Sequence, residues 1–134
     1  MRTNKQRLAP SRGLFIVWVA LATLPAAQAA GDAKLGADVF ATHCAECHSL
    51  KEGKHKKGPS LFALVGRNAG AQADFKYSAA MKAIGWTWSP DRLDPYLTLP
   101  NQALPGGAMK YEGLADAKAR ADLIAYFLRS SNAL

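Results

Sequence analysis

The sequence predicts a small all-α domain, and three observations support this prediction. Apolar residues recur at helical spacing in segments near both ends of the stretch 30–134. No stretch alternates polar and apolar residues as a half-buried strand does, and no internal repeat occurs. Cys44, Cys47 and His48 stand at positions i, i+3 and i+4, which share one face of a helical turn.

The five residues Cys44-Ala45-Glu46-Cys47-His48 prescribe a particular chemistry. Two cysteines separated by two residues and followed by histidine are the pattern of a c-type haem attachment site. On one helical face, both sulfurs and the imidazole can point at a single flat macrocycle. The motif therefore predicts two thioether bonds to one haem c and one protein ligand, His48, to its iron.

Other uses of this cysteine pair fit the sequence less well. A structural zinc site needs four ligands, commonly from two separated pairs, and the chain has only two cysteines. A thioredoxin-like redox pair follows a strand, whereas the segment before Cys44 has helical periodicity. A plain disulfide would not account for the adjacent His48.

The first 29 residues have the pattern of a secretory signal peptide. Four basic residues and no acid precede an apolar run over 14–24, and Ala27-Gln28-Ala29 is a small-x-small cleavage site. The apolar run is shorter than the roughly 20 residues that span a bilayer, which disfavours an uncleaved anchor. We expect cleavage after about Ala29 and export to a bacterial periplasm or an equivalent compartment.

Removing 29 of the 134 residues leaves 105, enough for one domain over 30–134. All ten acidic and thirteen of the seventeen basic residues lie in that part, so the formal charge falls from +7 to +3. Such a modest excess argues against a nucleic-acid binder, but it permits a local basic patch that steers an acidic partner protein. The core is rich in alanine, as expected if a buried haem supplies apolar volume.

Helix signals divide the domain in order. A helix beginning at Gly31 or Asp32 leads directly into Cys44, and a polar, lysine-rich loop over 49–60 follows. After a short apolar patch over 61–65, a short helix is expected from about Ser78 to Ile84, ending at Gly85.

Proline marks the second half of the chain. Ser89 is the expected N-cap of a helix that has Pro90 at its first position, and Pro95 should kink or shorten that helix. The segment 100–107, with two prolines and two glycines, is expected to contain no regular structure. The last helix should run from about Asp116 to Ser130.

The second iron ligand has four candidates in the mature part: His43, His55, Met81 and Met109. His43 belongs to the attachment helix and is badly placed to reach the opposite haem face, and His55 lies in the polar loop. Met81 lies in an amphipathic helix, where methionine is commonly core filler. Met109 follows an irregular Pro105-to-Ala108 segment and is the preferred candidate. An iron with both axial positions filled would leave none open, which favours an electron carrier over a haem enzyme.

Together these residues resemble a known family, the class I cytochromes c of the mitochondrial cytochrome c and bacterial cytochrome c2 group. The resemblance covers essentially all of 30–134. The motifs that carry it are Gly36-x-x-x-Phe40, Cys44-x-x-Cys47-His48-Ser49, Gly58-Pro59-x-Leu61, Gly66-Arg67, Tyr77, Trp88, Tyr96-Leu97, Pro105-Gly106 with Met109, and Asp122-Leu123-Ile124-Ala125-Tyr126.

The resemblance implies a single-haem fold in which the first and last helices cross near Gly36, Phe40 and Tyr126 while Ω-type loops surround the haem. It implies that the Pro59 carbonyl accepts a hydrogen bond from His48. It further implies propionate partners at Arg67, Tyr77 and Trp88, and a hydrogen bond from Tyr96 to the Met109 sulfur.

The chain departs from the family pattern near the proposed ligand. Gly107-Ala108 replaces the usual Thr-Lys before the methionine, and Lys110 follows it instead. Met81 stands where a polar Asn near a buried water is usual, which predicts a drier pocket. Tyr111 replaces the usual Phe.

The expected function is one-electron transport by an exported, soluble monomer between respiratory or photosynthetic partners. These partners would be a cytochrome bc1-type complex, an oxidase, a reaction centre or a dehydrogenase, with membrane contact only through them. Docking would be weak and salt-sensitive. The alternatives are a haem subunit bound permanently to a dehydrogenase or oxidase, and a peroxidase-like haem enzyme. The expected docking residues are Lys54, Lys56, Lys57, Lys76 and Lys110.

Overall fold

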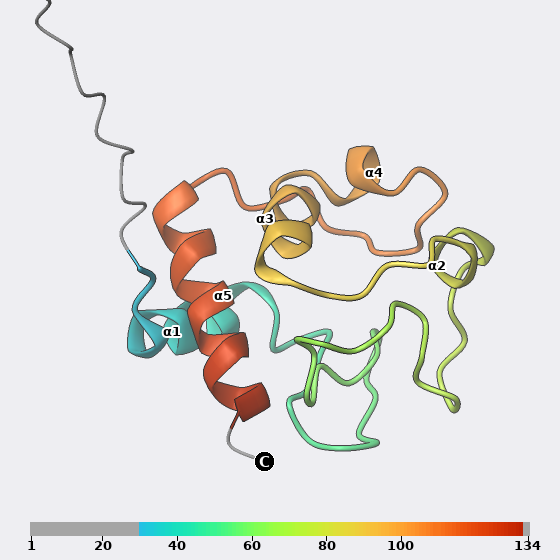
Figure 1. Cartoon of the computed structure of the whole chain (residues 1–134), viewed down its shortest axis with the longest axis horizontal. Coiled ribbons are helices and arrows are strands. Elements are labelled where there is room, and N and C mark those ends of the chain that lie inside the picture. The colour runs from blue at the N-terminus through green and yellow to red at the C-terminus, as the bar shows by residue number, and fades with distance from the viewer. Residues whose placement is uncertain (1–29, 133–134) are drawn as a thin grey trace, which may run out of the picture.

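The computed structural model describes residues 30–132, and the expected signal peptide lies outside the described residues. Within that range the fold is helical, with no strand beyond one isolated bridge between Asn68 and Thr87. Figure 1 shows the first and last helices crossing at one end of the molecule, with the shorter helices and long loops filling the other end. The helices are α1 (Ala33–His43), α2 (Ala79–Ala83), α3 (Pro90–Thr98), α4 (Pro100–Ala103) and α5 (Ala117–Asn132).

The crossing of α1 and α5 depends on a glycine. A Cβ at Gly36 would lie 2.0 Å from the carbonyl oxygen of Asp122, so only glycine allows the two backbones to approach this closely. Beside this contact the rings of Phe40 and Tyr126 pack with centroids 5.9 Å apart. The helix crossing that the family resemblance implies is therefore confirmed at the expected residues.

Side-chain caps fix where α1 and α2 begin. The Asp32 carboxylate accepts a hydrogen bond from the backbone N–H of Lys34, and the Ser78 hydroxyl accepts one from Met81. α2 is followed by Gly85 at φ 67°, a left-handed conformation that favours glycine. These starts agree with the helix signals in the sequence to within two residues.

The proline-rich region contains more helix than expected. α3 continues through Pro95 to Thr98, with Leu93, Tyr96 and Leu97 buried, although the Ser89 side chain forms no capping bond. The expectation that 100–107 contains no regular structure is wrong for Pro100–Ala103, which forms α4. Pro100 occupies the first turn of that helix, where a missing N–H costs nothing. Residues 104–109 remain irregular.

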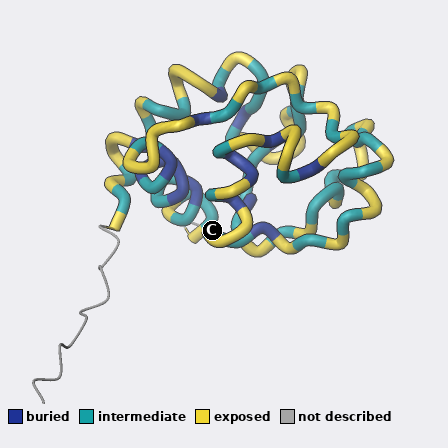
Figure 2. Tube along the Cα trace, turned by 90° about the horizontal axis from the view of Figure 1, so that it is seen from above, coloured by how far each residue is buried: buried dark blue, intermediate teal, exposed yellow. Residues whose placement is uncertain are grey.

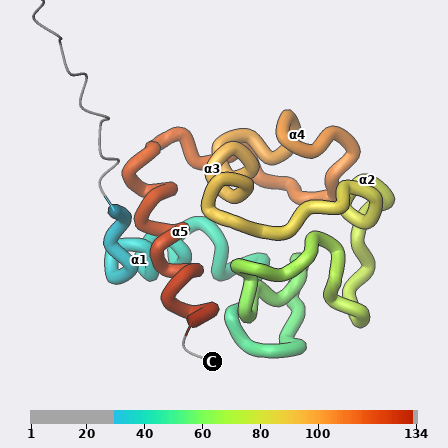
Figure 3. The backbone as a smooth tube through the Cα atoms, in the orientation of Figure 1, coloured from blue at the N-terminus to red at the C-terminus, as the bar shows by residue number. Residues whose placement is uncertain are grey.

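A long segment without helices connects α1 to α2, seen as the green part of the trace in Figure 3. Its first part closes on itself, because the N–H of Gly58 donates to the carbonyl of Cys47 at 2.7 Å and Leu61 donates to Ser49 at 2.8 Å. This closed loop is the Ω-type arrangement that the resemblance implies. It places Pro59 directly beside the attachment turn.

A buried arginine fastens α5 to the rest of the domain. Arg120 donates from Nε to Asp94 at 2.8 Å and from Nη1 to the carbonyls of Leu114 and Ala115. Phe127 and Leu123 of α5 are the largest fully buried side chains.

Elsewhere buried positions are few and are separated by stretches of intermediate exposure (Figure 2). Among residues 30–132, none of the helices is both long and apolar enough to cross a bilayer.

Candidate haem site

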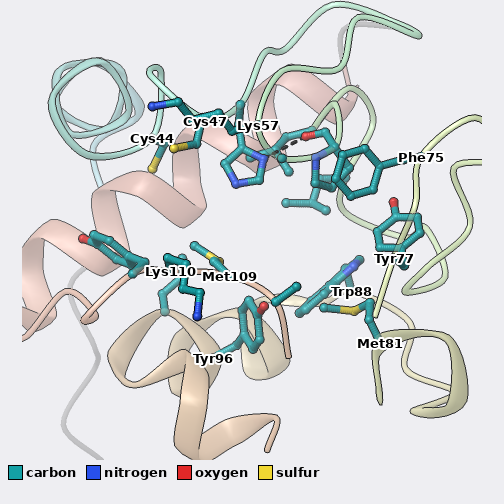
Figure 4. A pocket seen from close by; sticks show the side chains of 18 of the residues that line it. Cys44, Cys47, Lys57, Phe75, Tyr77, Met81, Trp88, Tyr96, Met109 and Lys110 are labelled. Atoms are coloured by element: carbon teal, nitrogen blue, oxygen red, sulfur yellow. Dashed lines mark hydrogen bonds between the residues drawn. The ribbon is translucent and has the colours of Figure 1, made fainter. Parts of the chain in front are cut away.

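A largely apolar cavity of about 400 Å³ lies between the attachment turn and the opposite wall formed by α2, α3 and the segment around Met109. Figure 4 shows Cys44 and Cys47 on one side of it, with Met109 and Tyr96 across from them and Trp88, Tyr77 and Met81 toward the far end. The chain therefore brings nearly all the expected site residues around one space.

The end of α1 presents the two cysteines. The N–H of Cys44 still bonds to Phe40 of the helix, and the next turn closes when His48 donates to the Cys44 carbonyl at 2.9 Å. Both cysteines are free thiols. Burial, together with the neighbouring Cys47, raises the pKa of Cys44 to about 11. Two unpaired thiols facing one cavity suit thioether formation, whereas a disulfide is not formed.

His48 is held in one orientation from behind. Its Nδ1 lies 2.8 Å from the Pro59 carbonyl, and because a carbonyl can only accept, Nδ1 carries the proton. This is the contact that the family resemblance implies. It leaves the Nε2 lone pair free for a metal. Burial lowers the pKa of His48, while the bond to Pro59 acts in the opposite direction. The imidazole is thus kept neutral, as a metal ligand must be.

Both methionines line the cavity. Met109 lies across from the cysteines in Figure 4, and Met81 lies beside Trp88 at the other end. His55 accepts a hydrogen bond from the N–H of Ser60 at 3.0 Å and packs on Phe75, so its Nδ1 is already used. His43 does line the cavity, beside Cys44 on the attachment side.

The aromatic wall is formed by Trp88 and Tyr96, which are both buried and pack with ring centroids 5.1 Å apart. Burial raises the pKa of Tyr96, so its phenol stays a hydrogen-bond donor into alkaline solution. Tyr77 also lines the cavity and has a raised pKa, again chiefly because of burial.

Arg67, an expected propionate partner, is not among the residues that line the cavity. Its Nη2 donates to the Ser60 carbonyl at 2.9 Å and Nη1 donates to Phe62, but Nε is buried without a hydrogen-bond partner among the described residues. Burial lowers the pKa of the guanidinium. A buried N–H with no acceptor is costly, and it is satisfied if an anionic group of a bound cofactor lies beside it.

Three of the five expected docking lysines, Lys57, Lys76 and Lys110, line the cavity with exposed side chains. Lys57 forms an exposed ion pair with Glu46. The other two expected lysines do not line it: Lys54 is exposed, and Lys56 donates to the carbonyl of Ala45.

Sequence reasoning missed three contributors to the site. Phe75 forms part of the wall, and a Cβ on Gly58 would lie 2.3 Å from Cε1 of His48. The Tyr111 hydroxyl lies 3.4 Å from Nδ1 of His43. The glycine next to Pro59 was the only signal available for any of these, because the other contacts join distant parts of the chain.

These residues fit a covalently bound haem. The chain supplies two free thiols, one neutral oriented imidazole, an apolar cavity with the Met109 sulfur across it, and an unpartnered buried N–H suited to a carboxylate. Within the described residues there is no cluster of three or more His, Cys, Asp or Glu side chains of the kind that holds a free metal ion.

Comparison with known proteins agrees with this fit. The family model for cytochrome c matches residues 33–131. The chain is 45% identical over 103 residues to cytochrome c of Guizotia abyssinica, covering 76% of this chain and 93% of that protein. It is 44% identical over 105 residues to cytochrome c of Gibberella zeae, covering 78% and 99%. For Arabidopsis thaliana cytochrome c the identity is 45% over 97 residues, covering 72% and 87%. The chain therefore belongs to the cytochrome c family, which carries electrons on a covalently attached haem c and is not a family of enzymes.

Proposed function

We propose that this protein is an exported one-electron carrier whose iron is held by His48 and Met109 and which docks to acidic redox partners through lysines around the cavity. The observation that carries the proposal is the placement of His48 and Met109 around one apolar cavity, with Met109 across from the cysteines. When bound, haem c supplies a one-electron iron couple, and a thioether ligand favours its reduced state.

The ligand roles follow from how each side chain is held. His48 presents Nε2 because Pro59 fixes its Nδ1 proton, so the imidazole needs no reorientation to bind. Met109 is preferred to Met81 because it lies across from the attachment cysteines rather than beside Trp88. Tyr96, a buried phenol on the same wall, is suited to donate to the Met109 sulfur.

Arg67, Tyr77 and Trp88 are assigned a separate role, which is to bind the haem propionates. We assign the unpartnered Nε of Arg67 to a haem propionate, with Tyr77 and the Trp88 indole as further donors. Arg67 is already oriented by two backbone carbonyls, so little conformational entropy is lost when the carboxylate binds.

The expected docking surface consists of Lys54, Lys56, Lys57, Lys76 and Lys110. Three of them surround the cavity, which is where an approaching partner would come closest to a bound haem. Exposed charges steer encounter over roughly a Debye length, about 8 Å at physiological ionic strength. Association should therefore be fast, weak and slower at high salt. The monomeric state, the periplasmic location and cleavage after about Ala29 complete the proposal, and they rest on the sequence alone.

The experiment that tests the ligation compares two methionine variants of the purified holoprotein. Met109→Leu should abolish the sulfur-to-iron absorption band of the oxidised protein and open the iron to carbon monoxide when reduced, because leucine cannot coordinate. Met81→Leu, of similar volume, should retain the band and is the control. Retention of the band in Met109→Leu together with its loss in Met81→Leu would reverse the assignment.

A second experiment tests export and partners. Mass spectrometry of the holoprotein purified from its natural host should give an N-terminus near Ala30, and a chain starting at Met1 would contradict cleavage. Size-exclusion chromatography should show a monomer. Stable copurification with a dehydrogenase or oxidase would instead support a permanent subunit.

A further inference from the structure

The segment that carries Met109 is fixed at its two ends and loosely held between them. At one end Gly107 donates to the Leu104 carbonyl at 3.0 Å, and at the other Leu114 donates to the Leu97 carbonyl at 2.8 Å. Between these points, residues 108–113 form no backbone hydrogen bond with any described residue. Their only hydrogen bond within residues 30–132 joins the Tyr111 hydroxyl to Nδ1 of His43, at 3.4 Å.

This contact joins the two walls of the cavity. His43 is the last residue of α1 and immediately precedes Cys44, whereas Tyr111 lies two residues after Met109. Both residues line the cavity, and their rings meet edge to face with centroids 6.3 Å apart. The contact therefore connects the wall that attaches the cofactor to the wall that bears the proposed sulfur ligand.

We propose that the Tyr111–His43 hydrogen bond is a clasp that positions the Met109 segment, and that opening the clasp frees Met109 to leave the iron. This inference rests on the proposed Met109 ligation. Either group can supply the proton: the Tyr111 hydroxyl donates when the His43 proton is on Nε2, and Nδ1–H donates when it is on Nδ1. At 3.4 Å the bond is long, so it opens readily.

The test measures how fast added imidazole replaces Met109 in the oxidised holoprotein. The loss of the sulfur-to-iron absorption band is the signal that is recorded. Tyr111→Phe keeps the ring and removes the hydroxyl, so replacement should be about twofold faster, the low end for a neutral hydrogen bond because this one is long and exposed. Tyr126→Phe removes a phenol at the α1–α5 crossing, away from the cavity lining, and should leave the rate unchanged.

A second pair of variants separates the clasp from general loosening. His43→Gln keeps polar groups that can pair with the Tyr111 hydroxyl, so it should show the slow rate of the natural protein. His43→Leu removes them and should show the faster rate of Tyr111→Phe, and combining the two changes should add nothing further.

The outcomes distinguish this inference from the ligation on which it rests. If the natural protein lacks the sulfur-to-iron band, the Met109 ligation fails. If the band is present and imidazole replaces Met109 no faster in Tyr111→Phe than in Tyr126→Phe, the clasp is overturned while the ligation stands. The same conclusion follows if imidazole replaces Met109 no faster in His43→Leu than in the natural protein.

Discussion

At the scale of single residues, the imidazole of His48 is fixed by its near neighbours. Pro59 supplies the carbonyl that holds Nδ1–H, and Gly58 supplies the space in which the ring lies. Burial in an apolar cavity keeps the ring neutral by lowering its pKa. Gly58 and Pro59, two consecutive loop residues, therefore determine which ring nitrogen of His48 faces the cavity.

We predict that Gly58→Ala impairs the site. The new Cβ would lie 2.3 Å from Cε1 of His48, closer than any real contact, so the ring or the loop must move. The holoprotein should form in lower yield and show altered axial ligation in its absorption spectrum. Gly53→Ala in the same loop meets nothing within 4 Å and strains only a φ of 62°, at a cost of about 1 kcal/mol, so it should bind haem normally. Equal behaviour of the two variants would show that the contact with His48 is unimportant.

The role of a site residue could be predicted from the sequence where its partners in the site lie a few positions away along the chain. Cys44, Cys47 and His48 lie within five positions, and the structure places them on one wall as their spacing implies. The Tyr111–His43 contact joins residues 68 positions apart, and the unpartnered Nε of Arg67 depends on which carbonyls its other nitrogens reach. Such features follow from tertiary packing, which local patterns do not specify.

At the scale of elements, α1 and α2 begin within two residues of their expected starts, whereas the expected effect of proline was wrong at Pro100. Asp32 and Ser78 cap α1 and α2 with their side chains, as residues of this type do in most proteins. Pro100 was interpreted as a helix breaker, whereas at the first turn of α4 proline is compatible with a helix. Whether a proline starts or ends a helix depends on the packing of the residues that follow it, here buried Leu104.

An acidic side chain of α5 also fastens the start of α1. The buried carboxylate of Asp122 accepts from the backbone N–H of Asp32 at 2.6 Å and from Nζ of Lys118. The bond from Lys118, followed by that from Asp32, lowers the pKa of Asp122 below its ordinary value of 3.8. The folded state therefore prefers the ionised form more strongly than the unfolded state does.

We predict that Asp122→Asn destabilises the protein in a pH-dependent way. Because the folded pKa is depressed, the carboxylate contributes its full stabilisation above about pH 3.8, and this contribution is lost as the pH falls through the lowered pKa. Urea unfolding should show a deficit in the variant at pH 7 that shrinks toward pH 2.5. Asp38→Asn, on an exposed position of α1, is the control and should show little deficit at pH 7. A deficit for Asp122→Asn that is constant with pH would indicate lost packing rather than lost charge.

At the scale of the whole molecule, the distribution of charge matters more than its total. The part from residue 30 onward has a formal charge of only +3, yet among residues 30–132 the charged side chains that line the cavity are Lys57, Lys76 and Lys110. Glu46 partly offsets them by pairing with Lys57. Encounter with an anionic partner depends on this local field and not on the isoelectric point.

We predict that Glu46→Gln accelerates reduction of the oxidised holoprotein by ferrocyanide, an anionic one-electron donor. The change removes the carboxylate that pairs with Lys57 at the cavity. The increase should be largest at low ionic strength and should fade above about 0.5 M salt, where the Debye length is only a few ångströms. Asp91→Asn alters the net charge equally, but Asp91 does not line the cavity, so its effect should be smaller. Identical rates for the two variants would mean that only net charge acts.

The crossing of α1 and α5 joins two segments that lie far apart along the chain. α1 leads directly into the haem-attachment residues, but its packing surface at Gly36 and Phe40 is completed only by Asp122 and Tyr126. Ribosomes make those partners 86 positions later (122 − 36 and 126 − 40), so the main packing surface of α1 has no partner until nearly all of α5 exists. We therefore expect the cysteines to stay accessible until α5 has been made, and a product that ends before α5 to lack the helix that closes the fold.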